Sequence, residues 1–162
     1  MDVALTDAEV GALVGEKKHL PGNYRSRLQP RAKRGRKERQ LDVTGADAGQ
    51  YRIVVSQSDA NPLAFSVILV YKMPGSNRLI RLRRYNGRGH QHTNQLERQT
   101  FYGCHVHMAT ERYQALGMRE DAYAEPTSRF ADLESAVRCL LEECGFEIPS
   151  DGALSLFGGQ QS

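Results

Sequence analysis

A long apolar run near the middle of the chain is the feature that most constrains the fold. Residues 63–72, LAFSVILVYK, are rich in β-branched and aromatic side chains, which predicts a central, buried strand. Residues 51–56 and 39–43 are further strand candidates. Residues 74–77, PGSN, are typical of a hairpin turn, so we expect residues 78–85 to return beside the central strand. Together these segments predict an antiparallel sheet.

The returning strand is predicted to have two different faces. Ile80 and Leu82 alternate with Arg81 and Arg83. In a strand this spacing places the apolar pair and the basic pair on opposite sides of the sheet. We therefore expect a packed face and a basic face, the latter carrying Arg81, Arg83 and Tyr85. This strand leads directly into a histidine-rich segment.

Two helices are predicted, one near each end of the chain. Residues 6–18 begin with Thr6 and Glu9 in the spacing of a capping box. Residues 132–144 give the strongest helical pattern, and Gly145 stands where a helix usually ends. The apolar face of this second helix is formed by Leu133, Val137, Leu140, Leu141 and Cys144.

The sum of these elements is an α+β domain over residues 1–148. We expect an antiparallel sheet of about four to six strands packed against the C-terminal helix, with a short N-terminal helix. The chain has 162 residues, which suits a single domain. Residues 149–162 are rich in Gly, Ser and Gln and are predicted to be a flexible tail.

Composition excludes several classes of protein. The chain has no apolar run of membrane-spanning length, and its first ten residues are acidic and too polar for a signal peptide, so we expect a cytoplasmic protein without membrane contact. The three cysteines lack the spacing of a disulfide framework or a cysteine zinc site. They are expected to be small buried residues: Cys104, Cys139 and Cys144.

Positive charge is concentrated in one segment. Residues 25–39 hold eight basic residues and one acid, Glu38, which gives this segment a charge of +7. The net charge of the chain is +3, so all the other residues together carry −4. Such a segment is either a phosphate-binding arm or a solvated, disordered run. We expect it to be a loop or arm. The candidate nucleic-acid-binding residues, here and in the later basic strand, are Arg31, Lys33, Arg34, Arg36, Lys37, Arg81, Arg83 and Arg88.

Four of the five histidines lie within 18 residues, as two His-x-His pairs. A spacing of two puts side chains on the same side of a strand. For His105 and His107 this fits well, because Cys104, Val106 and Met108 alternate with them. The other pair, His90 and His92, follows two glycines and is expected on a loop or at a strand end.

Three interpretations of the histidines stay open. Neutral imidazoles are common ligands of zinc, copper, nickel or iron. A pair of histidines can also act as general base and general acid, as in a metal-free ribonuclease. The third interpretation is a polar, partly buried face that only packs and forms hydrogen bonds. Candidate hydrogen-bond partners for the imidazoles are Glu111, Arg112, Tyr113, Asp121, Tyr123 and Glu125.

The order of motifs resembles a known family. LTDAEV, then strands, then LRRYNGRGHQHTN, GCHVHMATERY and a terminal helix ending in ECGF are similar to small bacterial and phage domains of unknown function. In that family a strand ends at Asn-Gly before H-x-N, and a second strand carries H-x-H. The arrangement also resembles, more distantly, the TumE-like toxins, whose partner antitoxin is a nucleotidyltransferase. The resemblance covers residues 4–10 and 63–148 and implies a mobile-element or toxin–antitoxin setting, with a possible antitoxin or host protein as partner.

Three functions follow from these observations. The first is an RNA-directed protein, with RNA more strongly expected than DNA, acting as a metal-free ribonuclease without cofactor. Its catalytic residues would be His92, His105 and His107, with Arg84 stabilising charge on the phosphate. The second is a zinc-type metal-binding domain, with Glu111 or Asp121 as further candidate ligands beside His90, His92, His105 and His107. The third is a non-enzymatic module that binds nucleic acid or protein.

Overall fold

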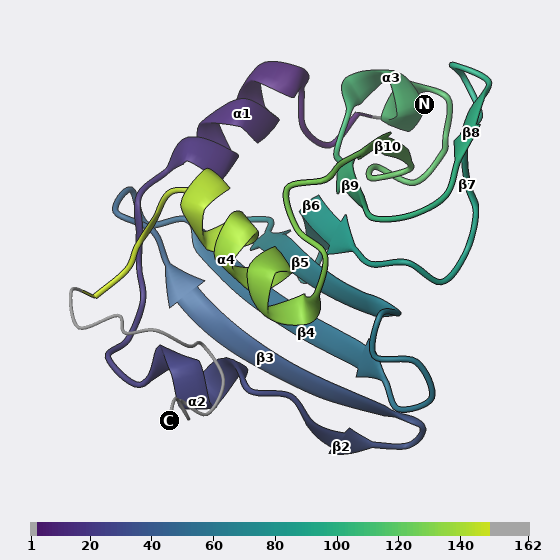
Figure 1. The fold of residues 1–162 in the computed structure, drawn as a ribbon. Helices are drawn as coiled ribbons and strands as arrows, with labels where there is room; N and C mark the ends of the chain where they lie inside the picture. The colour runs from purple at the N-terminus through teal and green to yellow at the C-terminus, as the bar shows by residue number, and fades with distance from the viewer. Residues whose placement is uncertain (1–2, 150–162) are drawn as a thin grey trace.

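The computed structural model describes residues 3–149 and shows an α+β fold, which confirms the predicted class. One antiparallel sheet of seven strands has the order β10-β9-β6-β5-β4-β3-β2, one strand more than the upper limit expected (Figure 1). Residues 150–162, nearly all of the predicted tail, lie outside the described part. The sheet strands are β2 (Arg31–Lys33), β3 (Arg36–Thr44), β4 (Gln50–Ser58), β5 (Phe65–Lys72), β6 (Leu79–Asn86), β9 (His105–Met108) and β10 (Tyr123–Pro126).

The register of the sheet separates an apolar face from a polar one. Val55, Val67, Tyr85 and Val106 are paired across four neighbouring strands, and all are buried in the hydrophobic core. The row one residue further along has the opposite orientation, because side chains alternate along a strand. That row is polar, and we call it the polar row: Ser56, Ser66, Asn86 and His105.

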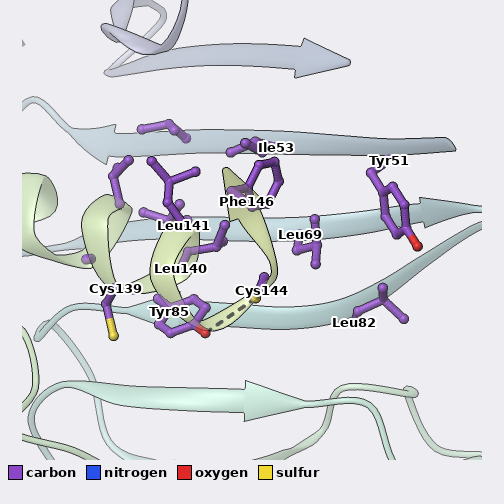
Figure 2. Packing of buried hydrophobic residues seen from close by; sticks show 14 of the residues in the cluster. Tyr51, Ile53, Leu69, Leu82, Tyr85, Cys139, Leu140, Leu141, Cys144 and Phe146 are labelled. Carbon is purple, nitrogen blue, oxygen red and sulfur yellow. Dashed lines mark hydrogen bonds between the residues drawn. The ribbon is translucent and has the colours of Figure 1, made fainter. Parts of the chain in front are cut away.

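Helix α4 (Leu133–Glu143) covers the apolar face, as the sequence predicts. Its buried residues pack onto the strands, and the Tyr85 hydroxyl contacts the Cys144 sulfur (Figure 2). Asp132 caps the first turn, and Gly145 follows the end with a positive φ of 78°. Helix α1 (Asp7–Gly15) has the predicted capping box but ends three residues earlier than expected.

The basic segment is not a loop or arm, as the sequence suggested. It contains helix α2 (Tyr24–Leu28) and the strands β2 and β3, which form an antiparallel hairpin. Gly35 supplies the turn between them with a φ of 68°. The charged side chains stay exposed because the hairpin extends along the edge of the sheet, beyond the core (Figure 1). We call residues 31–44 the basic hairpin.

The alternation predicted for strand β6 fails in its second half. Tyr85, expected on the basic face, is buried in the core with Ile80 and Leu82, and Arg83, also expected there, contacts Tyr85 and Glu143 on the side of helix α4. A register shift between Leu69 and Val70 of the neighbouring strand resets the alternation, so that both sides of the shift present apolar residues to helix α4.

The remaining elements surround the sheet. The small hairpin of β7 (His92–Asn94) and β8 (Gln99–Phe101) and the helix α3 (Glu111–Ala115) lie near β9 and β10 (Figure 1). Strands β1 (Lys18–His19) and β11 (Phe146–Glu147) form a parallel pair. All three cysteines are buried and free, as predicted. Within residues 3–149, no helix is both long and apolar enough to span a membrane.

Candidate metal centre

Strand β9 presents two histidines to the polar face of the sheet. Val106 packs in the core, so its neighbours His105 and His107 point to the opposite side, as predicted. Both are buried, with 0% and 5% of their surface exposed. In the adjacent strand β6, Asn86 is paired with His105 and Arg84 with His107.

The hairpin of β7 and β8 brings a third histidine to this face. The side-chain amide of Asn94 attaches the hairpin to β10 by two hydrogen bonds to the backbone of Ala124. Its nitrogen donates to the Ala124 carbonyl at 2.7 Å, and its Oδ1 accepts from the Ala124 N–H at 2.9 Å. The same Oδ1 lies 2.8 Å from Nε2 of His92. Asn94 therefore fixes both the hairpin and the ring of His92 against β10.

His92, His105 and His107 form what we call the histidine cluster. One ring nitrogen of each lies within 4.8 Å of one from the other two. The ring centroids are 4.8 Å apart for His92 and His107, and 5.0 Å apart for His105 and His107. His90 is exposed and lies edge-on to His105 at 5.7 Å, so it is a neighbour of the cluster but no member of that set.

Hydrogen bonds fix the proton on each ring of the cluster. Nδ1 of His105 lies 2.8 Å from the Gly103 carbonyl, and Nδ1 of His107 lies 2.7 Å from the Asp121 carbonyl. A carbonyl only accepts, so each Nδ1 donates and each Nε2 keeps a lone pair. The two Ala124 bonds orient Asn94 so that its acceptor faces His92, whose Nε2 therefore donates and whose Nδ1 keeps the lone pair.

The result is three imidazoles whose protonated nitrogens face fixed acceptors and whose other nitrogens are available to a ligand. Nε2 of His105 is buried and has no hydrogen-bond partner. A buried nitrogen without a partner is costly, and it indicates a role outside packing. Outer hydrogen bonds from the ring N–H to a carbonyl or amide are the usual arrangement around metal-binding histidines.

The electrostatic environment keeps the buried rings neutral. Burial, and then the positive charge of Arg84, lower the pKa of His107 to about 2. Burial also lowers the pKa of His105, although its hydrogen bond to Gly103 opposes this effect. A histidine that stays neutral at all ordinary pH values is a poor general acid, whereas neutral imidazole is the form that binds metal.

Asp121 holds the base of the site together. It is fully buried, and its Oδ2 accepts from Nε of Arg84 at 3.0 Å while its carbonyl accepts from His107. Its other oxygen lies 3.2 Å from Arg119 and 3.7 Å from Arg81. The carboxylate thus faces arginines, and Asp121 contacts the cluster through its backbone carbonyl, whereas the sequence analysis named it as a partner of the imidazoles or a further metal ligand.

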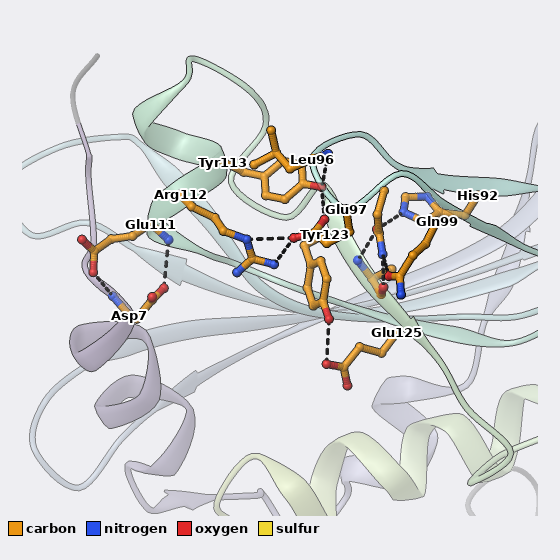
Figure 3. A network of polar contacts seen from close by, with 12 residues as sticks. Asp7, His92, Leu96, Glu97, Gln99, Glu111, Arg112, Tyr113, Tyr123 and Glu125 are labelled. Carbon is orange, nitrogen blue, oxygen red and sulfur yellow. Dashed lines mark hydrogen bonds and ion pairs between the residues drawn. The ribbon is translucent and has the colours of Figure 1, made fainter.

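The other polar candidates lie apart from the cluster. Glu111 and Asp7 cap each other's helices. Glu97 binds Arg112 and the hydroxyl of Tyr113 at 2.6 Å, which ties the β7–β8 turn to helix α3 (Figure 3). The hydroxyl of Tyr123 donates to Glu125. These five predicted candidates bind one another or other groups near the site rather than the rings: Glu111, Arg112, Tyr113, Tyr123 and Glu125.

The predicted basic residues divide into three places. Arg83 contacts the Tyr85 hydroxyl and Glu143 on the side of helix α4, the face opposite the histidines. Arg81 pairs with Glu120, and Arg88 is exposed. The remaining five, all exposed on the basic hairpin, are Arg31, Lys33, Arg34, Arg36 and Lys37.

Sequence reasoning missed Asn86, Asn94 and Ser66. Asn94 had a signal, since it is the last residue of the H-x-N motif, but only the hairpin explains why an amide is needed there. Searches of protein-family models, of curated proteins and of solved structures find no match to this chain. Function is therefore inferred from the site itself.

Proposed function

We propose that this protein binds a transition-metal ion of zinc type through His92, His105 and His107. Two observations carry the proposal: one ring nitrogen of each histidine lies within 4.8 Å of one from the other two, and the hydrogen bonds leave each ring one nitrogen with a lone pair. A tetrahedral zinc with bonds of about 2.0–2.1 Å holds its ligand atoms about 3.4 Å apart. The nitrogens lie within 4.8 Å, so side-chain shifts of about an ångström complete the geometry.

The number of ligands favours a catalytic centre over a structural one. Among the described residues the metal-binding group consists of three histidines, whereas structural zinc sites usually have four protein ligands. With an open position, such an ion lowers the pKa of water to about 7 and so supplies a nucleophile for hydrolysis. The chain contributes neutral rings, buried walls and Arg84, a cation held in place by Asp121.

A metal-free ribonuclease is supported less well. In that mechanism two histidines exchange protons with the substrate. His105 and His107 each have one nitrogen bound to a backbone carbonyl, and burial lowers the pKa of both. A neutral ring with one nitrogen bound to a carbonyl is suited to bind a metal through its other nitrogen. The same ring is a poor general acid, because its lowered pKa leaves it without a second ring proton to donate.

Metal analysis tests the proposal directly. Purified protein incubated with zinc and then desalted is expected to retain about one ion per chain, and the His107→Ala variant to retain none. His19→Ala is the matched control, because His19, on β1, is exposed and pairs with Glu147 of β11. His90→Ala separates a three-histidine site from a four-histidine one, and it should keep the ion. Wild-type protein that retains no zinc, nickel, copper or iron would overturn the proposal.

A nucleic-acid partner is the second part of the proposed function. The observation that favours it is the basic hairpin, a β-ribbon on which Arg31, Arg34 and Lys37 are exposed, and Lys33 and Arg36 are exposed but share one acid, Glu38. Phosphate contacts of this kind provide affinity without sequence preference. RNA is the proposed partner, and the toxin–antitoxin setting stays a prediction from the resemblance.

A further inference from the structure

A cavity of about 340 Å³ lies next to the histidine cluster on the polar face of the sheet. His90, whose ring contacts His105, and Arg84, paired with His107, both line it. At its other end are Gly35 and Arg36 of the basic hairpin. Among the described residues, no acidic side chain lines this cavity. Its lining includes the polar residues Arg36, Ser66, Arg84, Asn86, Arg88 and His90.

The polar row forms the floor of this cavity and ends at the cluster. Ser56, Ser66 and Asn86 line the cavity, and Asn86 is paired with His105. Three atoms of the row are buried without a hydrogen-bond partner: Oγ of Ser66, Oδ1 of Asn86 and Nε2 of His105. Buried polar atoms normally have a hydrogen-bond partner, so three unpaired atoms in the polar row indicate a site for a ligand that would bind them.

We propose that this cavity is the phosphate-binding site of the metal centre, and that the substrate is a phosphoester. Three guanidinium groups line the cavity: Arg88, Arg36, which pairs with Glu38, and Arg84, which pairs with Asp121. Guanidinium groups match phosphate oxygens in geometry. The Ser66 hydroxyl donates to a phosphate oxygen. Oδ1 of Asn86 can only accept, and it pairs with a P–OH or another hydroxyl of the ligand.

This inference rests on the proposed function, because the cavity gains its role from the neighbouring ion. A phosphoryl group over Ser66 and Asn86 lies beside His105, at the open side of the cluster. In the hydrolysis that follows, the oxygen of water bonds to phosphorus, the ester P–O bond breaks, and the proton lost by water ends on the departing alcohol oxygen. Arg84 stabilises the charge that gathers on the phosphate.

Ser66→Ala tests the site without removing a structural contact. Its hydroxyl has no partner, so the variant should be as stable as wild type or more stable. Inorganic phosphate, titrated calorimetrically into zinc-incubated protein, should bind about tenfold more weakly to Ser66→Ala, the loss expected for one hydrogen bond to a charged group. Thr110→Val is the matched control, since it also removes a buried hydroxyl without a partner, but outside the cavity.

The outcomes separate this inference from the proposed metal site. Equal phosphate affinity in wild type and Ser66→Ala, or no phosphate binding by wild type, overturns the cavity assignment even when zinc is retained. If wild type retains no metal but binds phosphate in a Ser66-dependent manner, the cavity assignment holds and the metal centre fails. An oligoribonucleotide that displaces phosphate identifies RNA as the source of the phosphoryl group, whereas displacement only by adenosine monophosphate identifies a free nucleotide.

Discussion

At the scale of single residues, the site depends on groups that hold the rings rather than on the rings alone. Asn94 is fully buried and forms hydrogen bonds with Ala124, through both backbone groups of that residue, and with His92 through Oδ1. Without this amide, the hairpin loses its side-chain hydrogen bonds to β10, and the proton on His92 is not fixed. Asn94 is therefore a positioning residue for the proposed metal centre.

Replacing Asn94 by alanine should weaken zinc binding by about 10–100-fold, the range found when hydrogen bonds behind metal-ligating histidines are removed. The ligands themselves stay in the chain, so the variant should still take up zinc at high concentration. Competition with a zinc-binding dye measures the change. Thr93→Ala, in the same hairpin but exposed, should bind zinc as wild type does. Equal affinities in Asn94→Ala and wild type would show that the amide does not orient His92.

At the scale of elements, one lysine connects the two longest helices. Lys18 is fully buried, and the three N–H groups of its ammonium face four carbonyls within 3.0 Å: Leu13 and Val14 in the last turn of helix α1, Glu16 at its C-cap, and Cys144 at the C-cap of helix α4. It also lies 4.4 Å from the centre of the Tyr51 ring. The last carbonyls of a helix have no partner within it, so Lys18 caps two helices at once.

Replacing Lys18 by methionine should lower the free energy of unfolding by at least about 3 kcal/mol, because the carbonyls lose the three N–H donors of the ammonium group and each buried, unpaired group costs about 1–3 kcal/mol. Urea denaturation measures the loss. Lys17→Met is the control, since the neighbouring side chain is exposed and should tolerate the change. A loss as small as that in Lys17→Met would contradict the capping role.

The charge state of Lys18 gives this prediction a pH dependence. Burial lowers its pKa from 10.5 to about 8 in the folded chain. Between these two pH values the unfolded chain holds a proton that the folded chain has released, so the contribution of Lys18 to stability increases as pH rises through that window. The difference in unfolding free energy between wild type and Lys18→Met should therefore be larger at about pH 10 than at about pH 7.

The elements that the sequence predicts well are those with local signals. The capping box at Thr6 and the glycine after helix α4 depend on neighbours within a few residues, and both are present. Strand β10 was missed because its pairing with β9 depends on distant residues. The basic segment was misjudged because charge hides strand alternation when both faces of a hairpin are exposed.

At the scale of the whole molecule, the spacing of His105 and His107 was enough to predict their shared face, but not the convergence of a third ring. His92 reaches the cluster only because Asn94 pairs with Ala124, a contact across 30 residues. The polar row likewise joins residues from four strands. Sheet register creates such sites, and it is set by the fold of the entire chain rather than by a motif.

The distribution of charge over the molecule yields a last prediction. The basic hairpin leads into the cavity beside the histidine cluster, so a polynucleotide lying on it would deliver a phosphate to Ser66. Each phosphate contact releases counterions, which makes affinity fall steeply with salt. The contacts to remove are four exposed charges, each replaced by glutamine: Arg31, Lys33, Arg34 and Lys37.

This fourfold variant should bind an oligoribonucleotide more weakly at low salt, and the slope of log affinity against log salt should shrink by up to about 3, because single strands contribute about 0.7 per contact. Fluorescence anisotropy over a range of salt concentrations measures both. Lys72→Gln with Arg78→Gln, exposed charges near the β5–β6 turn, should leave the slope unchanged. The fourfold variant should also retain zinc and phosphate, since its side chains lie outside the lining of the cavity. An unchanged slope in that variant would mean that the hairpin does not contact RNA, and the phosphoryl group in the cavity would then have to come from a small molecule.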